Sequence, residues 1–475
     1  MKIPVQSLCA NSGGGIKKFA CFKLTLCALL VCAGSHAWAL NPLVPKALLS
    51  DPVHDLPVTV GQNFGPSAVV VRGVPIEVPF SLRIFIKEIA SFSNTAAKGI
   101  SISGFNLTDQ LGRSIGKEAT LNCSIYRNPL VLLMDSPVEK FPNWICRSKN
   151  YQTMLMNNKL EIKPEGGFIA VGDSLYRGKL EVIQNGDKLE LVNEVGAEPY
   201  LAGLVNKEMH SSFPQEAVKA QIIAARSYAL ATAADRRRLG FNFDLYGTEA
   251  DQVYSGSEAE DAKASRLVKE VRGQVLMHQE NVLKAYYHSS SGGYSELPQN
   301  VWGKAETEQD NFAYSARSSP VDSSLEAAEW SIKVSPKLGL AWKDIGEIQN
   351  IKVLSRSEGK RVLSMRLEGA RTHKVISGTE FRRRMGLRIV KSTYFTVQKV
   401  DGGWLIEGRG WGHGVGLSQL GAKAMAEKGL KADEILRFYY PFASLRKLTL
   451  DTERKPASLP QEPKAASSLL PINAR

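Results

Sequence analysis

Residues 179–209 are KLEVIQNGDKLELVNEVGAEPYLAGLVNKEM, and the change of periodicity within this stretch decides the fold class. Two β-like runs flank the turn Asn185-Gly186-Asp187, and such runs around an Asn-Gly turn predict a β-hairpin. A helix is then predicted over residues 199–209, because its apolar residues follow one another at the spacing of a single helical face. Glu208 lies on that face, in the last turn. Strands and helices in close succession predict an α+β fold.

The same alternation continues towards the C-terminus. Pro214 suits the first position of an alanine-rich helix that is predicted to extend to about Arg238. Further β-like runs and helices follow, including a predicted strand over 282–288 and a last helix over 418–428. We therefore expect the larger domain to span residues 156–450 and to be built on a mixed β-sheet with helices. Residues 451–475 are rich in Pro, Ala and Ser and are expected to form a disordered tail.

Residues 40–155 differ in texture from the rest of the chain. Short β-like runs such as 67–72, 82–86 and 130–134 alternate with turn residues, which predicts a smaller β-rich accessory module. Before it, residues 1–39 combine lysines, a short apolar run and an Ala37-Trp38-Ala39 site, the pattern of a secretory signal peptide. A retained membrane anchor is the alternative. The expected product is an exported chain, periplasmic or secreted, with no stable membrane insertion.

The cysteines agree with export. Four of the six lie in the signal segment, so that the mature chain keeps only Cys123 and Cys146. An even pair in an oxidising compartment predicts one disulfide, and two free buried thiols are the alternative.

Composition describes a soluble globular protein of 475 residues, 43% hydrophobic and 23% charged. The formal charge of +13 falls to +9 when the four lysines of the signal segment are removed. An exported basic protein does not meet the genome, so nucleic acid is excluded as a partner. Cell-wall polymers and lipid headgroups are the polyanions that remain. Charge alone leaves open whether they are bound or whether the charge serves only solubility.

Glu208 is the first candidate for chemistry. Burial against an apolar helical face disfavours the charged form of a carboxyl, and so does the negative end of a helix dipole. Both raise the pKa towards a carboxylic acid that keeps its proton near neutrality, as a general acid requires. The alternative is that the apolar stripe ends there and Glu208 turns to solvent.

Polar loops supply further candidates. Arg226 stands among alanines that would let a polymer approach, and an arginine binds carboxylates bidentately. The loops 251–254 and 288–294 offer amide, tyrosine and serine groups. A serine hydrolase is excluded because the chain contains no Gly-x-Ser-x-Gly elbow.

Residues 408–416, GRGWGHGVG, form the densest motif. A nucleotide-binding loop is a poor interpretation, because Trp411 and His413 interrupt the glycines and no βαβ unit is evident. The glycines are expected to carry His413 to a fixed place beside a polymer or a packed strand. A core histidine bonded to backbone remains the alternative. The histidines of the mature chain show no metal-binding spacing, so no metal is expected.

Five strings occur in one order across residues 193–441: NEVGAEPYLAGLVNKEM, FPQEAVKAQIIAARSYAL, TEADQVYSG, AYYHSSSGGYSE, and GRGWGHGVGLSQLGAKAMAEKG followed by ILRFYYP. Together they resemble the stage II sporulation protein D family, also called the LytB amidase-enhancer family. The resemblance covers somewhat more than half of the chain. Each string alone would be a weak signal, and their common order makes the match specific.

The resemblance implies a lytic transglycosylase that cleaves the MurNAc–GlcNAc bond of peptidoglycan and leaves 1,6-anhydro-MurNAc ends. It implies a preference for glycan stripped of its stem peptides, Glu208 as the catalytic acid and base, and Arg226 at a position needed for activity. Some members hold zinc through cysteines and histidines, but no cysteine follows Cys146 here, so no cofactor is expected. The expected substrate contacts are Arg226, Tyr228, Gln252, Tyr254, Ser289, Ser290, Ser291, His413 and Gln419.

Two other classes compete with this interpretation. One is a non-catalytic peptidoglycan-binding protein that recruits or enhances an N-acetylmuramoyl-L-alanine amidase. The other is a structural protein anchored in the wall. Glu208 favours the enzyme, because a protein that only binds glycan has no need of a glutamate at that place.

Overall fold

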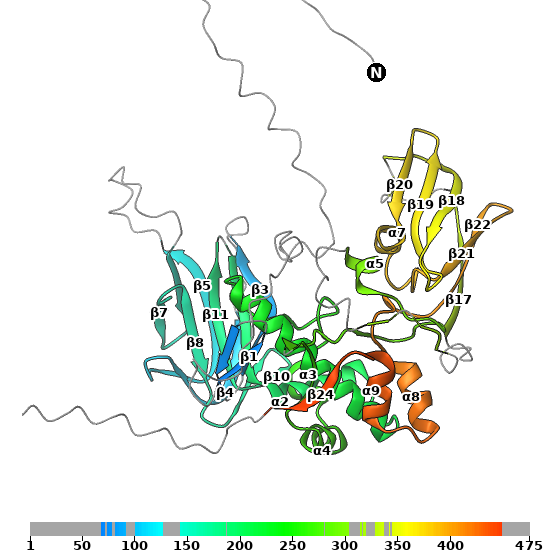
Figure 1. Cartoon of the computed structure of the whole chain (residues 1–475). Coiled ribbons are helices and arrows are strands. Elements are labelled where there is room, and N and C mark those ends of the chain that lie inside the picture. Colours follow the sequence, from blue (N-terminus) through cyan, green and yellow to red (C-terminus); the bar gives the residue numbers. More distant parts are fainter. Residues whose placement is uncertain are drawn as a thin grey trace, which may run out of the picture. The chain divides into compact units, whose positions relative to one another are not determined.

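The computed structural model describes residues 68–71, 74–77, 81–91, 100–126, 143–186, 188–279, 281–303, 314–315, 317–319, 328–336, 342 and 344–448 (Figure 1). The predicted signal peptide and the predicted C-terminal tail lie outside these residues, as does the predicted β-like run 130–134.

The largest sheet has eleven strands within the described residues. Its main path, in spatial order, is β13 (Leu245–Tyr246), β3 (Ser81–Ser91), β12 (Lys188–Gly196), β11 (Lys179–Asn185), β8 (Lys159–Lys163), β4 (Ile100–Asp109), β5 (Ser114–Tyr126), β6 (Asn143–Arg147) and β7 (Gln152–Met154). Two more strands, β9 (Phe168–Val171) and β10 (Ser174–Arg177), form a hairpin beside β4. All neighbours are antiparallel except β13 and β3.

The predicted hairpin is confirmed as β11 and β12, with Asn185 opposite Lys188 across the turn. The centres of both strands are buried, which accounts for the apolar runs in their sequences. The sheet also crosses the boundary predicted between residues 155 and 156. Strand β3 pairs with β12 and β4 pairs with β8, so that strands from both sides of the boundary share one hydrogen-bonded sheet. A disulfide links Cys123 on β5 to Cys146 on β6.

Helices α2 (Ala197–Glu208) and α3 (Gln215–Arg238) follow the sheet directly. Pro214 is the N-cap residue of α3 rather than its first helical residue, a shift of one position from the prediction. Most of α3 is buried, because its alanines let other elements pack closely around it. These elements are α2, α4 (Ala262–Glu270), β14 (Gln274–His278), α8 (Gln419–Glu427) and α9 (Ala432–Tyr439) (Figure 1).

A second hydrophobic core belongs to a smaller unit within residues 329–409. One of its three-stranded sheets has the order β17 (Glu329–Val334), β22 (Gly403–Arg409), β21 (Phe395–Val400). The other has the order β18 (Ile348–Arg356), β19 (Val362–Gly369), β20 (His373–Ser377), with helix α7 (Gly378–Met385) beside it. Trp330, Trp342, Met365, Phe381 and Phe395 are buried in this core.

Short elements complete the described chain. These are β1 (Ala68–Val71), β2 (Val74–Glu77), the 3-10 helix η2 (Gly256–Ala259), β15 (Asn281–Val282), β16 (Tyr287–His288), α5 (Pro298–Trp302), β23 (Leu417–Ser418) and β24 (Ser444–Lys447). The single strand predicted over 282–288 is wrong: irregular backbone separates β15 from β16. The predicted helix 418–428 corresponds to α8, whereas α9 was not predicted.

The fold is therefore α+β, as the sequence predicts. Among the helices that the structure describes, none combines the length and the apolar character that a membrane crossing needs.

Candidate active site

Glu208 is the last residue of α2, and its side chain is only partly exposed. The helix residues that precede it on the same face, Leu204 and Val205, are fully buried. The backbone N–H of Val253 donates a hydrogen bond of 2.7 Å to Oε1 of Glu208, and the Tyr287 side chain forms a second hydrogen bond with the carboxyl. Burial outweighs both bonds and raises the pKa of Glu208 to about 7. The carboxyl therefore retains its proton near neutrality and is still reached by solvent.

The loop 251–254 holds this arrangement from behind. Asp251 accepts a hydrogen bond from the Tyr228 hydroxyl at 2.9 Å and forms an ion pair of 2.6 Å with Arg236. Both ion-pair partners are almost fully buried. The backbone N–H of Tyr246 donates to the same carboxylate. Because these partners lie on α3 and on β13, Asp251 fixes the start of the loop to both elements.

Gln252 is completely buried, and its side-chain amide forms hydrogen bonds with two tyrosine hydroxyls and one backbone carbonyl. Its Oε1 accepts a hydrogen bond from the Tyr200 hydroxyl at 2.9 Å. Its Nε2 donates to the Ala225 carbonyl and to the Tyr287 hydroxyl, both at 3.1 Å. Gln252 thereby orients Tyr287, which in turn contacts Glu208. The Gln252 side chain is fully buried, so no group from outside the protein reaches it.

Tyr254, Tyr228 and Arg226 are likewise buried rather than exposed as sugar or carboxylate contacts. The Tyr254 hydroxyl donates to Asn193 Oδ1 at 3.1 Å. The Arg226 guanidinium is 2% exposed and donates to both carboxylate oxygens of Glu198, at 2.9 and 2.8 Å. Its third bond goes to the carbonyl of Gln274. The alanines around Arg226 let α3 pack against β14, and they leave no approach for a polymer.

The serine-glycine loop (288–296) and the glycine-histidine loop (408–416) lie together. Ser290 and Trp411 form a β-bridge, and the N–H of Glu296 donates to the carbonyl of Gly414. Ser290 and Ser291 are buried, whereas Ser289 is partly exposed. Gln419 is also partly exposed, at the first position of α8. Of these predicted contacts, Ser289 and Gln419 are the two whose side chains reach the surface.

His413 belongs to an aromatic group beside these loops. Its ring centroid lies 5.0 Å from that of Trp302 and 5.4 Å from that of His288, and Tyr286 stacks on Trp302 at 4.3 Å. The His413 Nδ1 accepts a hydrogen bond from the N–H of Val415. Burial, with His288 and the cations Arg382 and Arg361 nearby, lowers the pKa of His413 well below its usual value. The imidazole is therefore neutral across the physiological range.

Sequence reasoning missed Tyr286, Tyr287, Trp302 and Arg361. The two tyrosines precede the serine-glycine loop directly, so the doublet in AYYHSSSGG was the available signal. Tyr286 also packs edge-on against Tyr228, which places the aromatic group next to the Glu208 network. Trp302 and Arg361 stand in segments without a recognisable motif.

Arg361 connects the smaller unit to both loops. It is 1% exposed, and its Nη2 donates to the Ser291 carbonyl at 2.9 Å. Gly414 has φ +88°, and a Cβ built there would lie 2.4 Å from Cζ of Arg361. The neighbouring Ser357 hydroxyl donates to Glu296 Oε2. The smaller unit therefore determines the path of both loops.

Comparison with known proteins agrees with the motifs. Residues 185–278 match the family model described as "Stage II sporulation protein". The stage II sporulation protein D of Bacillus amyloliquefaciens is 31% identical over 272 residues, which are 52% of this chain and 74% of that protein. The chain therefore belongs to the stage II sporulation protein D family.

Two further relatives extend the comparison. The amidase enhancer of Bacillus subtilis is 28% identical over 52% of this chain, and the match spans 40% of that longer protein. A Brachyspira hyodysenteriae protein named as uncharacterized is 29% identical over 61% of this chain and 81% of its own length.

Residues 306–416 match a separate family model, described as a domain of unknown function (DUF8618). Within the described residues, His, Cys, Asp and Glu side chains form no group of three or more that suits a metal.

Proposed function

We propose that this protein is a peptidoglycan lytic transglycosylase in which Glu208 acts first as acid and then as base. Family membership supports a role at the cell wall. The observation that carries the proposal is a single partly exposed carboxyl whose burial raises its pKa to about 7. Two carboxylates of the surrounding network are already paired, Asp251 with Arg236 and Glu198 with Arg226. The charge of the exposed Glu249 also raises the pKa of Glu208, and Glu249 pairs with Arg388 at 3.4 Å.

A single carboxyl with a raised pKa at this place favours a transglycosylase over a hydrolase. Ordinary glycosidases use two carboxyl groups, of which one protonates the leaving oxygen and the other activates water or attacks the sugar. In a lytic transglycosylase the 6-hydroxyl of the muramic acid is the internal nucleophile. Glu208 donates its proton to the glycosidic oxygen as the C1–O bond breaks. Its carboxylate then takes the proton of the 6-hydroxyl as O6 bonds to C1, which yields the 1,6-anhydro end and restores the acid.

The surroundings supply binding and positioning. Val253 and Tyr287 orient the carboxyl, and the partly exposed rings of Tyr286 and Trp302 offer stacking surface for sugar faces. The partly exposed Ser289, His413 and Gln419 are further candidate contacts. In this proposal Arg226, Tyr228, Gln252 and Tyr254 position the loop behind Glu208 and do not touch substrate.

The second candidate is a non-catalytic amidase enhancer, favoured by the similarity to the protein of that name. Digestion of intact and amidase-stripped glycan strands separates the two proposals. The transglycosylase releases soluble glycan from stripped strands faster than from intact ones, without an added amidase. Stimulation of an added amidase, with no glycan cleavage and with retained binding to sacculi, would establish the enhancer instead.

A further inference from the structure

The smaller unit carries an open cavity of about 570 Å³ on the sheet β17–β22–β21, within the size range of ligand sites. The cavity follows from the strand register. Trp330, Gly408 and Phe395 lie opposite one another across the three strands, with their side-chain positions buried in the core. The rows on either side point outward. The cavity is thus lined by these outward rows, with Trp330, Gly408 and Phe395 completing the lining, and we call it the trough.

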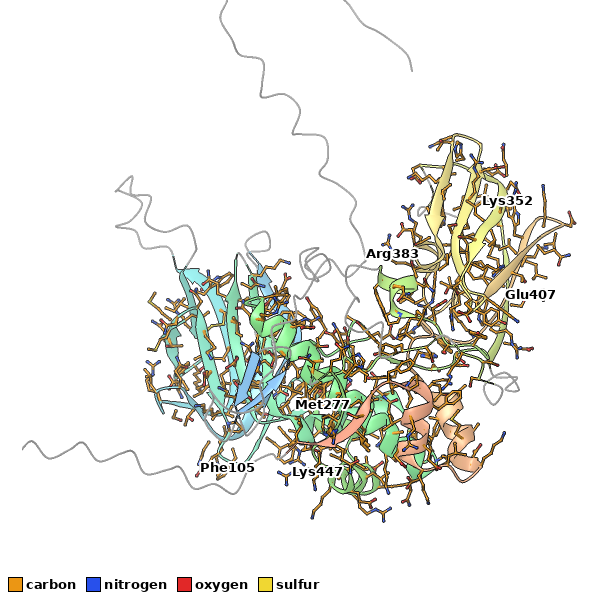
Figure 2. All side chains as sticks on the ribbon, in the orientation of Figure 1. Phe105, Met277, Lys352, Arg383, Glu407 and Lys447 are labelled. Carbon is orange, nitrogen blue, oxygen red and sulfur yellow. A yellow bond between two sulfur atoms is a disulfide. The ribbon has the colours of Figure 1, made fainter. Side chains whose placement is uncertain are left out.

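Polar side chains form both walls of this trough. Glu329, Arg409 and Tyr394 make one row, and Ser331, Glu407 and Thr396 make the other. Glu329 and Arg409 form an ion pair of 3.3 Å. The exposed Glu407 carboxylate has no hydrogen bond or ion pair with any described residue, and Figure 2 labels its side chain on this sheet. The trough therefore presents hydroxyls and a carboxylate that are ready to bond a ligand.

The charges in and around the trough indicate which class of ligand it can bind. Residues 344–409 contain fourteen Lys and Arg residues against seven Asp and Glu residues, so the unit as a whole attracts anions. The trough is the exception, because its two carboxylates face one arginine that Glu329 already pairs. An anionic group, such as the lactyl carboxylate of a MurNAc unit, is therefore disfavoured there. A cationic ligand is also disfavoured, because Arg409 lies in one wall and Lys333 follows Ser331 on the same outward face. A neutral, hydroxyl-rich ligand fits this mixture of donors and acceptors.

The trough also adjoins the candidate active site along the chain. Arg409 is followed directly by Gly410, whose carbonyl accepts a hydrogen bond from Trp330 Nε1 at 3.1 Å and whose N–H donates to Ala328. Three residues lie between Arg409 and His413, so their Cα atoms, four chain steps apart, are at most about 14 Å apart. A glycan chain of several sugars is long enough to extend from one to the other.

We infer that the trough is a second glycan-binding site, which holds a neutral N-acetylglucosamine unit of a strand whose other units bind at Glu208. The inference rests on the proposed function and adds to it. It predicts that affinity rises with glycan length and that Glu407 is needed only for the additional part.

The test uses the full chain with Glu208→Gln, so that the probe is bound and not cut. Binding of short and long β-1,4-linked N-acetylglucosamine oligomers is measured by calorimetry, with and without Glu407→Ala. Loss of a hydrogen bond to a charged group weakens the long oligomer about tenfold. The short oligomer binds as before. The matched control is Glu368→Ala, which removes a half-exposed carboxylate from the other small sheet and leaves both affinities unchanged.

Equal affinity of the long oligomer for the parent and Glu407→Ala would overturn the inference, and so would an absence of any length dependence. A stem peptide that displaces the long oligomer from the parent, but not from Glu407→Ala, would assign the trough to peptide instead. These results are separate from failure of the proposed function, which appears as absence of glycan cleavage by the chain that retains Glu208.

Discussion

The backbone N–H of Val253 donates a 2.7 Å hydrogen bond to Oε1 of Glu208, so the carboxyl at the end of α2 is fixed by a loop 45 residues away. The neighbouring Gln252 fixes Tyr287, the second group on the same carboxyl. The loop therefore sets the direction of Glu208, and its hydrogen bonds lower the pKa against the larger effect of burial.

The pH dependence of activity follows from the pKa of Glu208. The first step requires the protonated carboxyl, so kcat/KM is highest on the acid side and falls as the pH rises through about 7. The measurement is the rate of glycan cleavage between pH 5 and pH 9. A profile that is flat through pH 7 would assign the essential proton to another group.

Stability should report the same pKa without any substrate. Folding favours the protonated form of Glu208, so its contribution is fully present below the usual carboxyl pKa of 4.5 and is lost as the pH rises through about 7. Glu208→Gln does not titrate. The free energy of unfolding of Glu208→Gln therefore rises relative to that of the parent between these pH values, by about 3 kcal/mol at pH 8. Denaturant unfolding at pH 4.5 and pH 8 checks this, and a constant difference would contradict it.

Tyr287→Phe removes a hydrogen bond that lowers the pKa of Glu208. The pKa should therefore rise further, and the alkaline limb of the rate profile should move to higher pH. Tyr254→Phe is the matched control, because it removes a buried hydroxyl that bonds Asn193 and not Glu208. An identical displacement of the limb in both variants would show a general effect on folding instead.

Arg226→Met should destabilise the fold by about 3 kcal/mol, because it leaves the Glu198 carboxylate without its partner. Combining it with Glu198→Gln should recover much of that loss. The free energy of unfolding of the two single variants and the double variant measures the coupling. If Arg226→Met kept its stability but lost glycan binding, Arg226 would be a direct substrate contact, as the sequence analysis expected.

Gly414→Ala tests how the smaller unit controls the active-site loops. The new Cβ meets the Arg361 guanidinium, so the loops must separate and the cleavage rate should fall at least tenfold. Gly429→Ala is the control: its φ of +92° carries the same backbone strain, but nothing lies within 4 Å of the new Cβ. Comparable cleavage rates in the two variants would show that the contact between Gly414 and Arg361 does not control catalysis.

Local pattern predicts part of this architecture. Periodicity gives the β11–β12 hairpin and places Glu208 in the last turn of α2, because both depend on neighbouring residues. The partners of Asp251, Gln252 and Arg226 depend on contacts between elements. Sequence reasoning therefore made Gln252 and Arg226 substrate contacts, whereas both side chains are buried, and it gave Asp251 no role. Arg361 lies 70 residues from Ser291, and no local signal connects them.

The most direct test digests amidase-stripped glycan with the parent protein and with Glu208→Gln, and reads the new ends by mass spectrometry. Glu208→Gln keeps the size of the side chain and its hydrogen bond from Val253 but has no transferable proton. The account predicts 1,6-anhydro-muramyl ends from the parent and none from Glu208→Gln. Equal amounts of these ends from both proteins, or reducing ends from the parent, would contradict it.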